Sequence, residues 1–489
     1  MMVRSRMLWR VVACVCVVVG VNTLHAQTEA ADYSRIGFGA FLTATASDYQ
    51  CVGINPANLG FVPEFDVYIM GSPIDGGMDR AKRNWSFTVA EGGFATHSDA
   101  LKRGDLWDAV FQSSSFDFTP EQKLAAARAF ADNGLRFSAD IIPVAISYQS
   151  DKWGGLALTV HERVSGTFIF NESASRLAFE GRYYDYFDST SVNYKGDTVG
   201  YARNPQTYAQ LFEGTRLAMT WYRELGLSYG LKILDVPGFR LYAGATAKYL
   251  MGYAYMDAEV RDHQLMARSS LSPVFGISYG KAVSPSFIPG KDFRSVGNGW
   301  GLDIGLTAEI GLKWTISASV VDLGAMRWDG NVFIAKDTIL NGVSSTGFNN
   351  YNIFEEAPKI TGEGNFFSWN GLSTATSELA SRIRGGISYY HTSRWRFGID
   401  AVVPFNRAAG SLGEPIVSGG VDWRPLIWLR VSTGFGGGGN MGTFIPIGAM
   451  ASLFGGVWEL GLSSRDIITL FTTKRPVLSL CVGLMRIRL

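Results

Sequence analysis

Residues 301–322 alternate apolar and polar side chains on both sides of a very short turn. The apolar positions are Leu302, Ile304, Leu306, Ala308 and Ile310 before the turn, and Trp314, Ile316, Ala318 and Val320 after it. Successive side chains of a β-strand point to opposite faces, so this period of two predicts two strands. The pattern recurs along most of the chain with many apolar faces. We therefore predict an all-β protein, a transmembrane antiparallel β-barrel, in preference to a soluble β-sandwich.

The first 26 residues have the features of a secretory signal peptide. Arg4, Arg6 and Arg10 precede an apolar run at 11–21, and a small-residue cleavage site ends at Ala26. The apolar run is too short for a spanning helix, and no later stretch offers ~20 consecutive apolar residues. A lipoprotein signal ending at Cys14 is the alternative, which we disfavour because the apolar stretch continues past this residue.

Charge and cysteine content exclude several classes of function. Removal of the signal peptide takes away three Arg and no acidic residue, so the formal net charge falls from +1 to −2. A nucleic-acid-binding protein needs a basic patch, and we expect no nucleic-acid partner. Only Cys51 and Cys481 remain, which is neither a disulfide framework nor a zinc site, and no cofactor motif is present. We predict two free thiols, no metal and no cofactor.

Tight turns alternate with long polar connections, as in bacterial outer-membrane barrels. Five of the turns are followed by a Trp, at Trp153, Trp314, Trp395, Trp428 and Trp458. Short turns of such barrels face the periplasm, and Trp prefers the membrane interface, so these residues predict an aromatic girdle at the periplasmic side. The long connections include 165–215 and 323–381, which we expect to be extracellular loops.

The alternation predicts about fourteen strands, and an even number is expected for a bacterial single-chain barrel. They are 65–72, 137–149, 155–164, 217–233, 240–252, 299–310, 314–322, 382–390, 395–403, 416–423, 429–435, 445–454, 457–463 and 477–489. Two more strand-like runs, 84–90 and 274–280, do not fit the parity, and a count of sixteen stays open. A bulge near Gly483 would reconcile the two apolar faces of the last strand. Thr119-Pro120-Glu121 predicts the start of one helix, which ends at Asn133-Gly134.

The polar faces of these strands must point into the barrel, because a Lys or Arg at the lipid midplane costs ~2–4 kcal/mol. We single out Lys232, Lys248, Asp303, Glu309, Arg396 and Asp400 as candidate lumen-facing residues. Their mixed signs predict a lumen that is cross-linked by ion pairs or plugged, in preference to a channel for ions of one sign.

The segment before the first strand resembles a known family. It reads Gly37-Phe38-Gly39-Ala40, then residues 44–49, then Asn55-Pro56-Ala57-Asn58-Leu59. This resembles the N-terminal hatch of the FadL-like outer-membrane transport superfamily, with Asn58 where the superfamily more often has Gly. The resemblance implies a hatch at 27–63 with Asn55, Pro56, Ala57 and Asn58 as its motif. It also implies a fourteen-stranded barrel at 64–489 in the outer membrane of a Gram-negative bacterium.

By this resemblance the protein transports small hydrophobic molecules passively, with outer-membrane lipid and a small hydrophobic ligand as partners. The alternative is a non-transporting barrel that acts as an assembly or type IX secretion accessory partner, with the long polar loops as its contact surface. A hydrophobic gap in the wall beside the hatch would favour transport, and a sealed wall would favour the partner role. We expect no enzyme, because His161, the main inward-facing His, stands in no Ser–His–acid arrangement.

Overall fold

The computed structural model describes residues 35, 37–61, 83–106, 117–194, 196–277, 279, 282–351, 356, 368–439, 441–473 and 476–489. The predicted signal peptide and the whole of the predicted strand 65–72, with its neighbours from 62 to 82, lie outside these residues. Within the described part, no helix is both long enough and apolar enough to cross a membrane.

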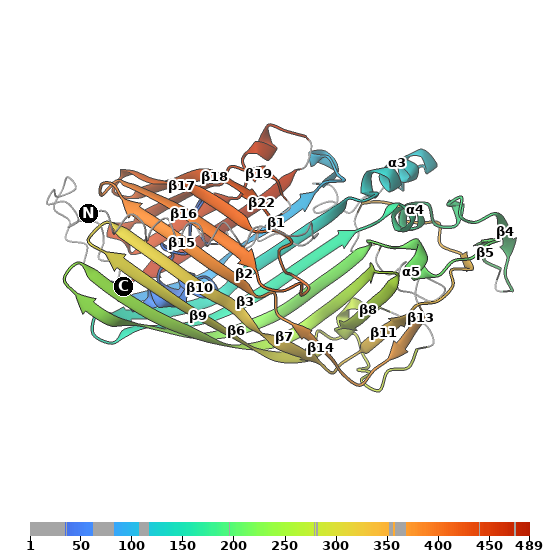
Figure 1. The fold of residues 1–489 in the computed structure, drawn as a ribbon, viewed down its shortest axis with the longest axis horizontal. Helices are drawn as coiled ribbons and strands as arrows, with labels where there is room; N and C mark the ends of the chain where they lie inside the picture. Colours follow the sequence, from blue (N-terminus) through green and yellow to red (C-terminus); the bar gives the residue numbers. More distant parts are fainter. Residues whose placement is uncertain are drawn as a thin grey trace, which may run out of the picture.

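Fourteen antiparallel strands form a closed barrel (Figure 1). They are β1 (Trp85–Ser98), β2 (Gly134–Ser150), β3 (Gly154–Ile169), β6 (Arg216–Val236), β7 (Phe239–Arg261), β9 (Gly297–Ile310), β10 (Trp314–Trp328), β15 (Arg382–Tyr390), β16 (Trp395–Pro404), β17 (Ile416–Leu426), β18 (Leu429–Gly438), β20 (Ile447–Leu453), β21 (Trp458–Ser464) and β22 (Val477–Arg488). Each pairs with the next along the chain, and β22 pairs with β1 to close the circle. The predicted fold class is confirmed.

Thirteen of the fourteen predicted strands coincide with barrel strands, and the N-terminal one, 65–72, lies outside the described residues. The run 84–90, which did not fit the predicted parity, is the start of β1. It pairs with both β2 and β22, so it belongs to the wall. The described part of the run 274–280, which was left open as a possible extra strand or loop hairpin, forms no strand, and its start belongs to a 3-10 helix, η5 (Pro273–Phe275).

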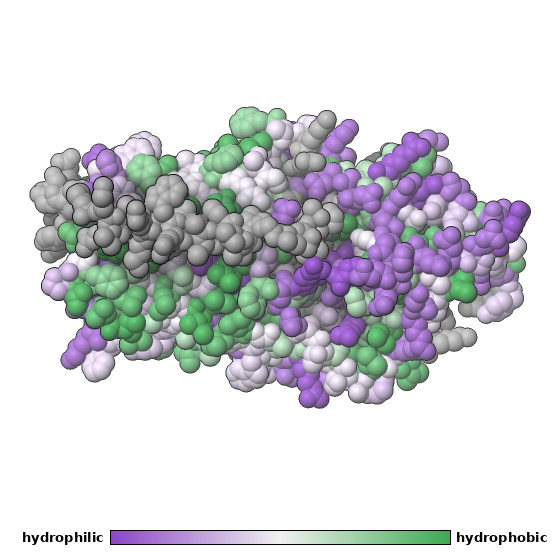
Figure 2. Space-filling model, viewed as in Figure 1, coloured by the Kyte–Doolittle hydropathy of each residue, from purple (hydrophilic) through white to green (hydrophobic). Residues whose placement is uncertain are grey.

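The outer surface of the barrel is an apolar belt, which appears as green patches on the barrel half of the molecule in Figure 2. Outward side chains such as Leu227, Ile304 and Ile399 are about half exposed, whereas their inward neighbours are buried. Trp153 and Trp314 are exposed at the ends of their strands beside the tight turns, as the predicted girdle requires. This arrangement suits a wall surrounded by lipid.

The ends of the barrel differ strongly, and we name them the short-turn end and the long-loop end. At the short-turn end β1 begins and β22 ends, and the Leu489 N–H donates to the Trp85 carbonyl there. The long-loop end carries a cap of short elements, toward the right in Figure 1. They are α3 (Pro120–Phe130), α4 (Glu172–Glu180), η4 (Gly181–Tyr183), β4 (Ser189–Val192), β5 (Thr198–Tyr201), α5 (Tyr208–Leu211), β8 (Gln264–Leu271), β11 (Val332–Lys336), β12 (Gly342–Val343), β13 (Ser368–Gly371), β14 (Ala375–Glu378), β19 (Thr443–Phe444) and η7 (Ile468–Leu470).

The cap has a hydrophobic core of its own, so the expectation of simple polar loops at 165–215 and 323–381 was wrong. Phe130 of α3 and Phe179 of α4 are fully buried, with ring centres 5.2 Å apart. The predicted helix is confirmed as α3, which starts with a capping box between Thr119 and Gln122. In the second connection, β10 continues as far as Trp328, and β11, β13 and β14 extend the sheet. Apolar residues spaced irregularly among polar ones build this core, and no simple period reveals them.

Pairing between neighbouring strands is continuous around the circle, with local breaks of register. One break falls in the last strand, where the β21–β22 register shifts next to Gly483 and both Leu484 and Met485 are exposed. The predicted bulge is therefore confirmed. At the short-turn end, β3 pairs with β6 only as far as Gly230, while β6 continues to Val236. Apart from this strand end, the described wall is paired without a gap beside the hatch segment, which is the outcome that we expected to favour the partner role.

Candidate functional site

Residues 37–61, which we call the hatch segment, fill the middle of the barrel. Nearly all of them are buried, and they form two short 3-10 helices, η2 (Asp48–Cys51) and η3 (Pro56–Gly60). The first helix contacts β1, β2 and β3, and the second contacts β6, β7 and β9. The hatch segment thus bridges opposite parts of the wall, and it lies inside the strands on the left of Figure 1.

The Asn-Pro motif is held by side-chain hydrogen bonds to itself and to β9. The Asn55 side chain accepts from the Ala57 N–H at 3.2 Å and so caps η3, in which Pro56 occupies the first position. Asn55 Nδ2 donates to Thr307 Oγ1 at 2.9 Å, and that hydroxyl donates to Asn58 Oδ1 at 2.6 Å. Asn58 Nδ2 donates to the Ala46 carbonyl at 2.8 Å. Both Asn residues are fully buried, so each lost partner would leave a desolvated polar group.

Three wall glycines let the hatch backbone approach the strands. A Cβ atom on Gly230 or Gly244 would lie 2.6 Å or 2.4 Å from the Pro56 carbonyl oxygen, and one on Gly305 would lie 1.9 Å from Asn55 Oδ1. No larger residue fits there without moving the hatch segment. These glycines therefore form a groove on adjacent strands β6, β7 and β9 that accepts η3.

Charged side chains fix the rest of the hatch segment. Asp400, one of the predicted lumen-facing residues, accepts from the N–H groups of Leu42 at 2.7 Å and Thr43 at 2.9 Å. Arg35 lies 3.3 Å from Asp140 of β2 and donates to the Val52 carbonyl at 3.0 Å. These contacts couple the hatch segment to opposite sides of the barrel.

A network of largely buried charges lines the inner wall on six consecutive strands, from β3 to β15, beside the hatch segment. Lys248 Nζ lies 2.8 Å from Asp303, 2.5 Å from Asp322 and 3.6 Å from Glu224. The network also includes Arg163, 3.1 Å from Asp322, and Arg382, 2.8 Å from Asp322. The sequence identified Lys248 and Asp303, and the structure brings them together. Because removal of one partner leaves uncompensated charge in a buried site, such a network resists local opening.

Asp322, Glu224 and Arg382 are network residues that were not selected from the sequence, and Asp322 is the one that contacts all three cations. It lies in the run Val320-Val321-Asp322-Leu323, where the β9–β10 register shifts, and it has a positive φ of 59°. Such a backbone conformation is uncommon outside glycine. The interruption of the two-residue period at this carboxylate was the signal that could have found it. Arg163 and Glu224 complete the network from β3 and β6.

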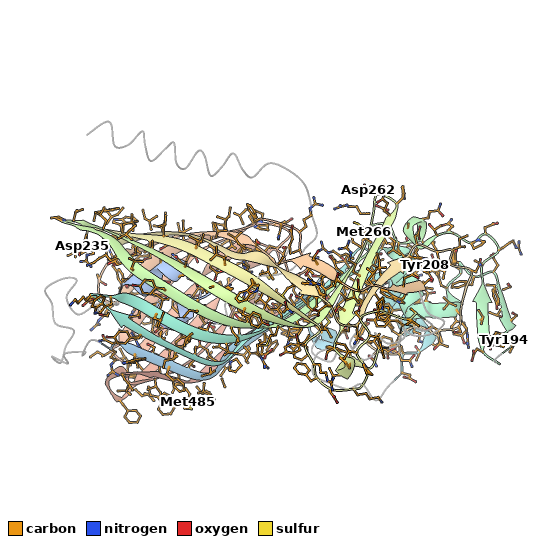
Figure 3. The ribbon with its side chains drawn as sticks, turned by 90° about the horizontal axis from the view of Figure 1, so that it is seen from below. Tyr194, Tyr208, Asp235, Asp262, Met266 and Met485 are labelled. Atoms are coloured by element: carbon orange, nitrogen blue, oxygen red, sulfur yellow. The ribbon has the colours of Figure 1, made fainter. Side chains whose placement is uncertain are left out.

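The remaining predicted lumen residues surround a cavity of about 400 Å³ at the short-turn end, which we call the turn-side vestibule. Lys232 pairs with Asp235, the tip residue labelled in Figure 3, and Glu309 accepts from Tyr242 at 2.7 Å. Arg396 pairs with Asp422 and donates to the Tyr390 hydroxyl at 3.0 Å. The described lining includes eight cationic and four anionic side chains, namely Lys232, Arg240, Lys313, Arg396, Arg424, Arg430, Arg486 and Arg488, and Asp151, Asp235, Glu309 and Glu459.

On the other side of the network lies a smaller cavity of about 70 Å³, which we call the loop-side pocket. Its walls include Tyr222, Met326, Trp328 and Leu379. Trp328 is almost fully buried and its indole N–H donates to Ser377 at 2.9 Å. Its floor includes Arg163, whose guanidinium nitrogen would be 2.6 Å from a Cβ on Gly53 of the hatch segment. The sequence analysis missed this pocket because it placed residues 323–381 in an extracellular loop.

The two cysteines are free and buried, as predicted. Cys51 belongs to the hatch segment, whereas Cys481 lies in β22. Among the residues that the structure describes, no group of three or more His, Cys, Asp and Glu side chains is arranged to hold a metal ion.

The fold and the site together define a class of protein: a transmembrane β-barrel whose lumen is closed by an internal hatch. Within this class, the chain belongs to a family of unknown function, DUF5723, whose model matches residues 82–455. No curated protein matches the chain.

Solved structures with a related fold include three barrels. The toluene transporter TodX of Pseudomonas putida is 10% identical, with a TM-score of 0.44, over 96% of this chain and 99% of that chain. A FadL homologue of Pseudomonas aeruginosa is 11% identical, with a TM-score of 0.37, over 95% and 99% of the two chains. The translocator domain of the autotransporter NalP of Neisseria meningitidis is 8% identical, with a TM-score of 0.30, over 84% and 91%.

Proposed function

We propose that this protein is a passive channel for small hydrophobic molecules in the outer membrane of a Gram-negative bacterium. The hatch segment closes the lumen in the state described here, and passage requires it to move. The observation that carries the proposal is the loop-side pocket, in which Tyr222, Met326, Trp328 and Leu379 share the lining with charged side chains such as Asp140, Arg163 and Arg382. The pocket lies inside the barrel, directly against residues that hold the hatch. A channel for ions or sugars would instead need a continuous polar path.

The size of the loop-side pocket limits what it accepts in this state. Pockets for drug-sized ligands are ~300–1,000 Å³, whereas this one is about 70 Å³. It therefore serves as an entry constriction that a small ring compound widens by displacing side chains such as Leu379 and Met326. The FadL-like character of the hatch sequence agrees with this role.

The orientation follows from the two ends of the barrel. Short turns of bacterial barrels face the periplasm and long loops face outward, so the cap and the loop-side pocket are extracellular and the turn-side vestibule opens to the periplasm. The signal peptide expected at residues 1–26 agrees with export. A hydrophobic molecule would enter beneath the cap, meet the charge network and leave once the hatch segment has shifted.

Transport in liposomes tests the proposal. The purified barrel is reconstituted, and entry of radiolabelled toluene is compared with entry of a neutral polar solute of similar size, with protein-free liposomes as the baseline. We expect protein-dependent entry of toluene and little entry of the polar solute. A variant lacking residues 37–59 should admit both, because the plug is gone. Absence of protein-dependent toluene entry in a correctly folded barrel would contradict the proposal.

A further inference from the structure

The turn-side vestibule has a positive lining that its own acidic residues do not balance. Its described lining carries eight cationic and four anionic side chains within a cavity of about 400 Å³. This is the volume of a small-molecule binding site, and it is several times larger than the loop-side pocket. Charge of one sign that is focused in a cleft with low-dielectric walls raises the local concentration of the opposite ion.

Most of the acidic groups are already engaged with part of this positive charge. Asp235 pairs with Lys232, and Glu309 lies 3.4 Å from Arg240. Glu459 lies 2.9 Å from Arg486 and 3.7 Å from Arg488. Behind the lining, Asp422 pairs with Arg396 and also acts on Arg430. Asp48 of the hatch segment also pairs with Arg486. Among the described residues, Lys313 and Arg430 are then the lining cations in excess, since neither forms an ion pair with an acidic side chain.

Arg430 is the cation around which this excess is concentrated. Its side chain is 9% exposed, one guanidinium nitrogen donates to the Gly37 carbonyl at 3.0 Å, and the group lies 4.4 Å from the ring centre of Phe38. Among the described residues, its Nε has no hydrogen-bond partner. A buried guanidinium with an unused donor is suited to carboxylate or phosphate oxygens, which it binds in a planar fork.

Apolar and aromatic side chains share the lining with these cations. Phe61 and Tyr242 meet edge to face with ring centres 5.6 Å apart, and Trp314 and Trp428 lie at the rim. A bound anion would thus have contact surface for an apolar body beside the donors for its charged group. The two Trp residues also provide a fluorescence signal from within the site.

We propose that the turn-side vestibule is a binding site for a small anion that carries a carboxylate or phosphate group, with Arg430 as its principal donor. The anion competes with the Gly37 carbonyl for the same guanidinium, so occupancy of the vestibule weakens one of the contacts that hold the hatch segment. Binding of the anion at this site does not depend on whether toluene crosses the barrel. A negative result for anion binding is therefore distinguishable from a negative result for transport.

Calorimetric titration of the full-length mature barrel in a non-ionic detergent, at constant ionic strength, tests this inference. The probes are sodium benzoate and inorganic phosphate, with toluene as the uncharged counterpart of benzoate. We expect saturable binding of benzoate, phosphate or both. A response to benzoate alone identifies a carboxylate with an apolar body, and a response to phosphate alone identifies the phosphate group. Quenching of Trp fluorescence should follow the same titration curve.

The variant Arg430→Gln should weaken the binding at least tenfold, whereas Lys152→Gln, which removes an exposed cation from a nearby turn outside the lining, should leave it unchanged. Heat-modified migration on a gel shows whether each variant folds. If Arg430→Gln does not fold, Lys313→Gln decides, because it removes a lining cation at a turn and should weaken binding about threefold. No saturable response to either anion, or equal affinity in the folded Arg430→Gln or Lys313→Gln barrel, would overturn the proposal.

Discussion

The two cavities of the lumen differ in both size and chemistry, and they share only part of the wall. The loop-side pocket is about 70 Å³ and has Tyr222, Met326, Trp328 and Leu379 in its walls. The turn-side vestibule is about 400 Å³ and contains eight cationic side chains. Between them lie the hatch segment and the network around Lys248. Buried ion pairs and the hatch segment thus separate a small, partly apolar cavity from a large, charged one in the state described here.

The way in which each region is held also differs. The cap above the loop-side pocket is stabilised mainly by aromatic and aliphatic burial. The hatch segment combines a hydrophobic cluster against β2 and β3 with buried hydrogen bonds and ion pairs to the wall. Apolar packing is non-directional, while buried polar contacts hold one geometry and are lost together. The hatch segment is thus suited to two discrete positions.

Of the substitutions considered, removal of Lys248 should have the largest effect on stability and on the barrier between the two cavities. The substitution Lys248→Met leaves Asp303, Asp322 and Glu224 close together in a buried site, and breaking such a buried pair costs about 3–5 kcal/mol. We expect the free energy of unfolding in urea to fall by this amount, and the barrier between the two cavities to weaken. Lys152→Met, at an exposed turn, is the matched control. A loss below about 1 kcal/mol for Lys248→Met would show that the network does not stabilise the barrier.

Enlargement of the loop-side pocket tests whether the two cavities bind different molecules. Trp328→Ala removes an almost fully buried indole and should lower the free energy of unfolding by about 3 kcal/mol, at the small end of the usual range because the site borders an existing cavity. Binding of toluene should become tighter or faster while benzoate binding at the vestibule is unchanged. Trp300→Ala, at a 66% exposed position, is the control. Equal effects of the two substitutions on toluene binding would argue against the loop-side pocket as the entry.

Displacement of the hatch segment tests the groove of wall glycines. Gly305→Ala places a Cβ atom 1.9 Å from Asn55 Oδ1, so the hatch must move, and overpacking of this kind costs about 2 kcal/mol. We expect faster toluene entry in liposomes together with this loss of stability. At Gly385 a Cβ atom meets nothing within 4 Å, so Gly385→Ala serves as the control. Unchanged entry and stability for Gly305→Ala would show that the hatch does not depend on this contact.

The smallest expected effect is a pH dependence at the long-loop end. Asp99 directly follows β1. Partial burial raises the pKa of its carboxyl, but the hydrogen bond and charge of His97 and the charge of Arg136 outweigh this effect and lower the pKa to about 2. The ordinary value is about 3.9, so this carboxylate stabilises the folded state above about pH 4 and loses its contribution as the pH falls through about 2. The contribution is about 1 kcal/mol after solvent screening. Urea unfolding of wild type and Asp99→Asn between pH 2 and pH 6 measures this contribution. Plots of the free energy of unfolding against pH that run parallel for the two proteins would contradict the prediction.

The sequence was sufficient for the barrel wall because lipid imposes a strict two-residue period on every strand. Leu225, Leu227 and Tyr229 show it, and the strand they belong to was found within a few residues of its true ends. The lumen was only partly predictable. Lys248 and Asp303 were chosen because they face inward, but their joint contact with Asp322 depends on a bulge that shifts the register.

The cap could not be predicted, for a different physical reason. Its core brings together residues from connections far apart in the chain, such as Phe130 and Phe348, and no local period marks them. The same holds for the loop-side pocket, in which Leu379 and Trp328 meet across β14 and β10. Local patterns report which face of an element is buried, but they do not report which distant element covers it.

The central claim is that the hatch segment must move for a hydrophobic molecule to pass, and a reversible lock tests it most directly. A Cβ atom on residue 305 would lie 3.0 Å from the Asn55 Cγ, the position that the sulfur takes in Asn55→Cys. This distance suits a disulfide between Asn55→Cys and Gly305→Cys. The same chain carries Cys51→Ala and Cys481→Ala, so that no other thiol competes. Toluene entry into liposomes is measured for the oxidised and the reduced forms of this one variant. We expect oxidation to abolish entry and reduction to restore it. Equal entry in the two forms would contradict the account.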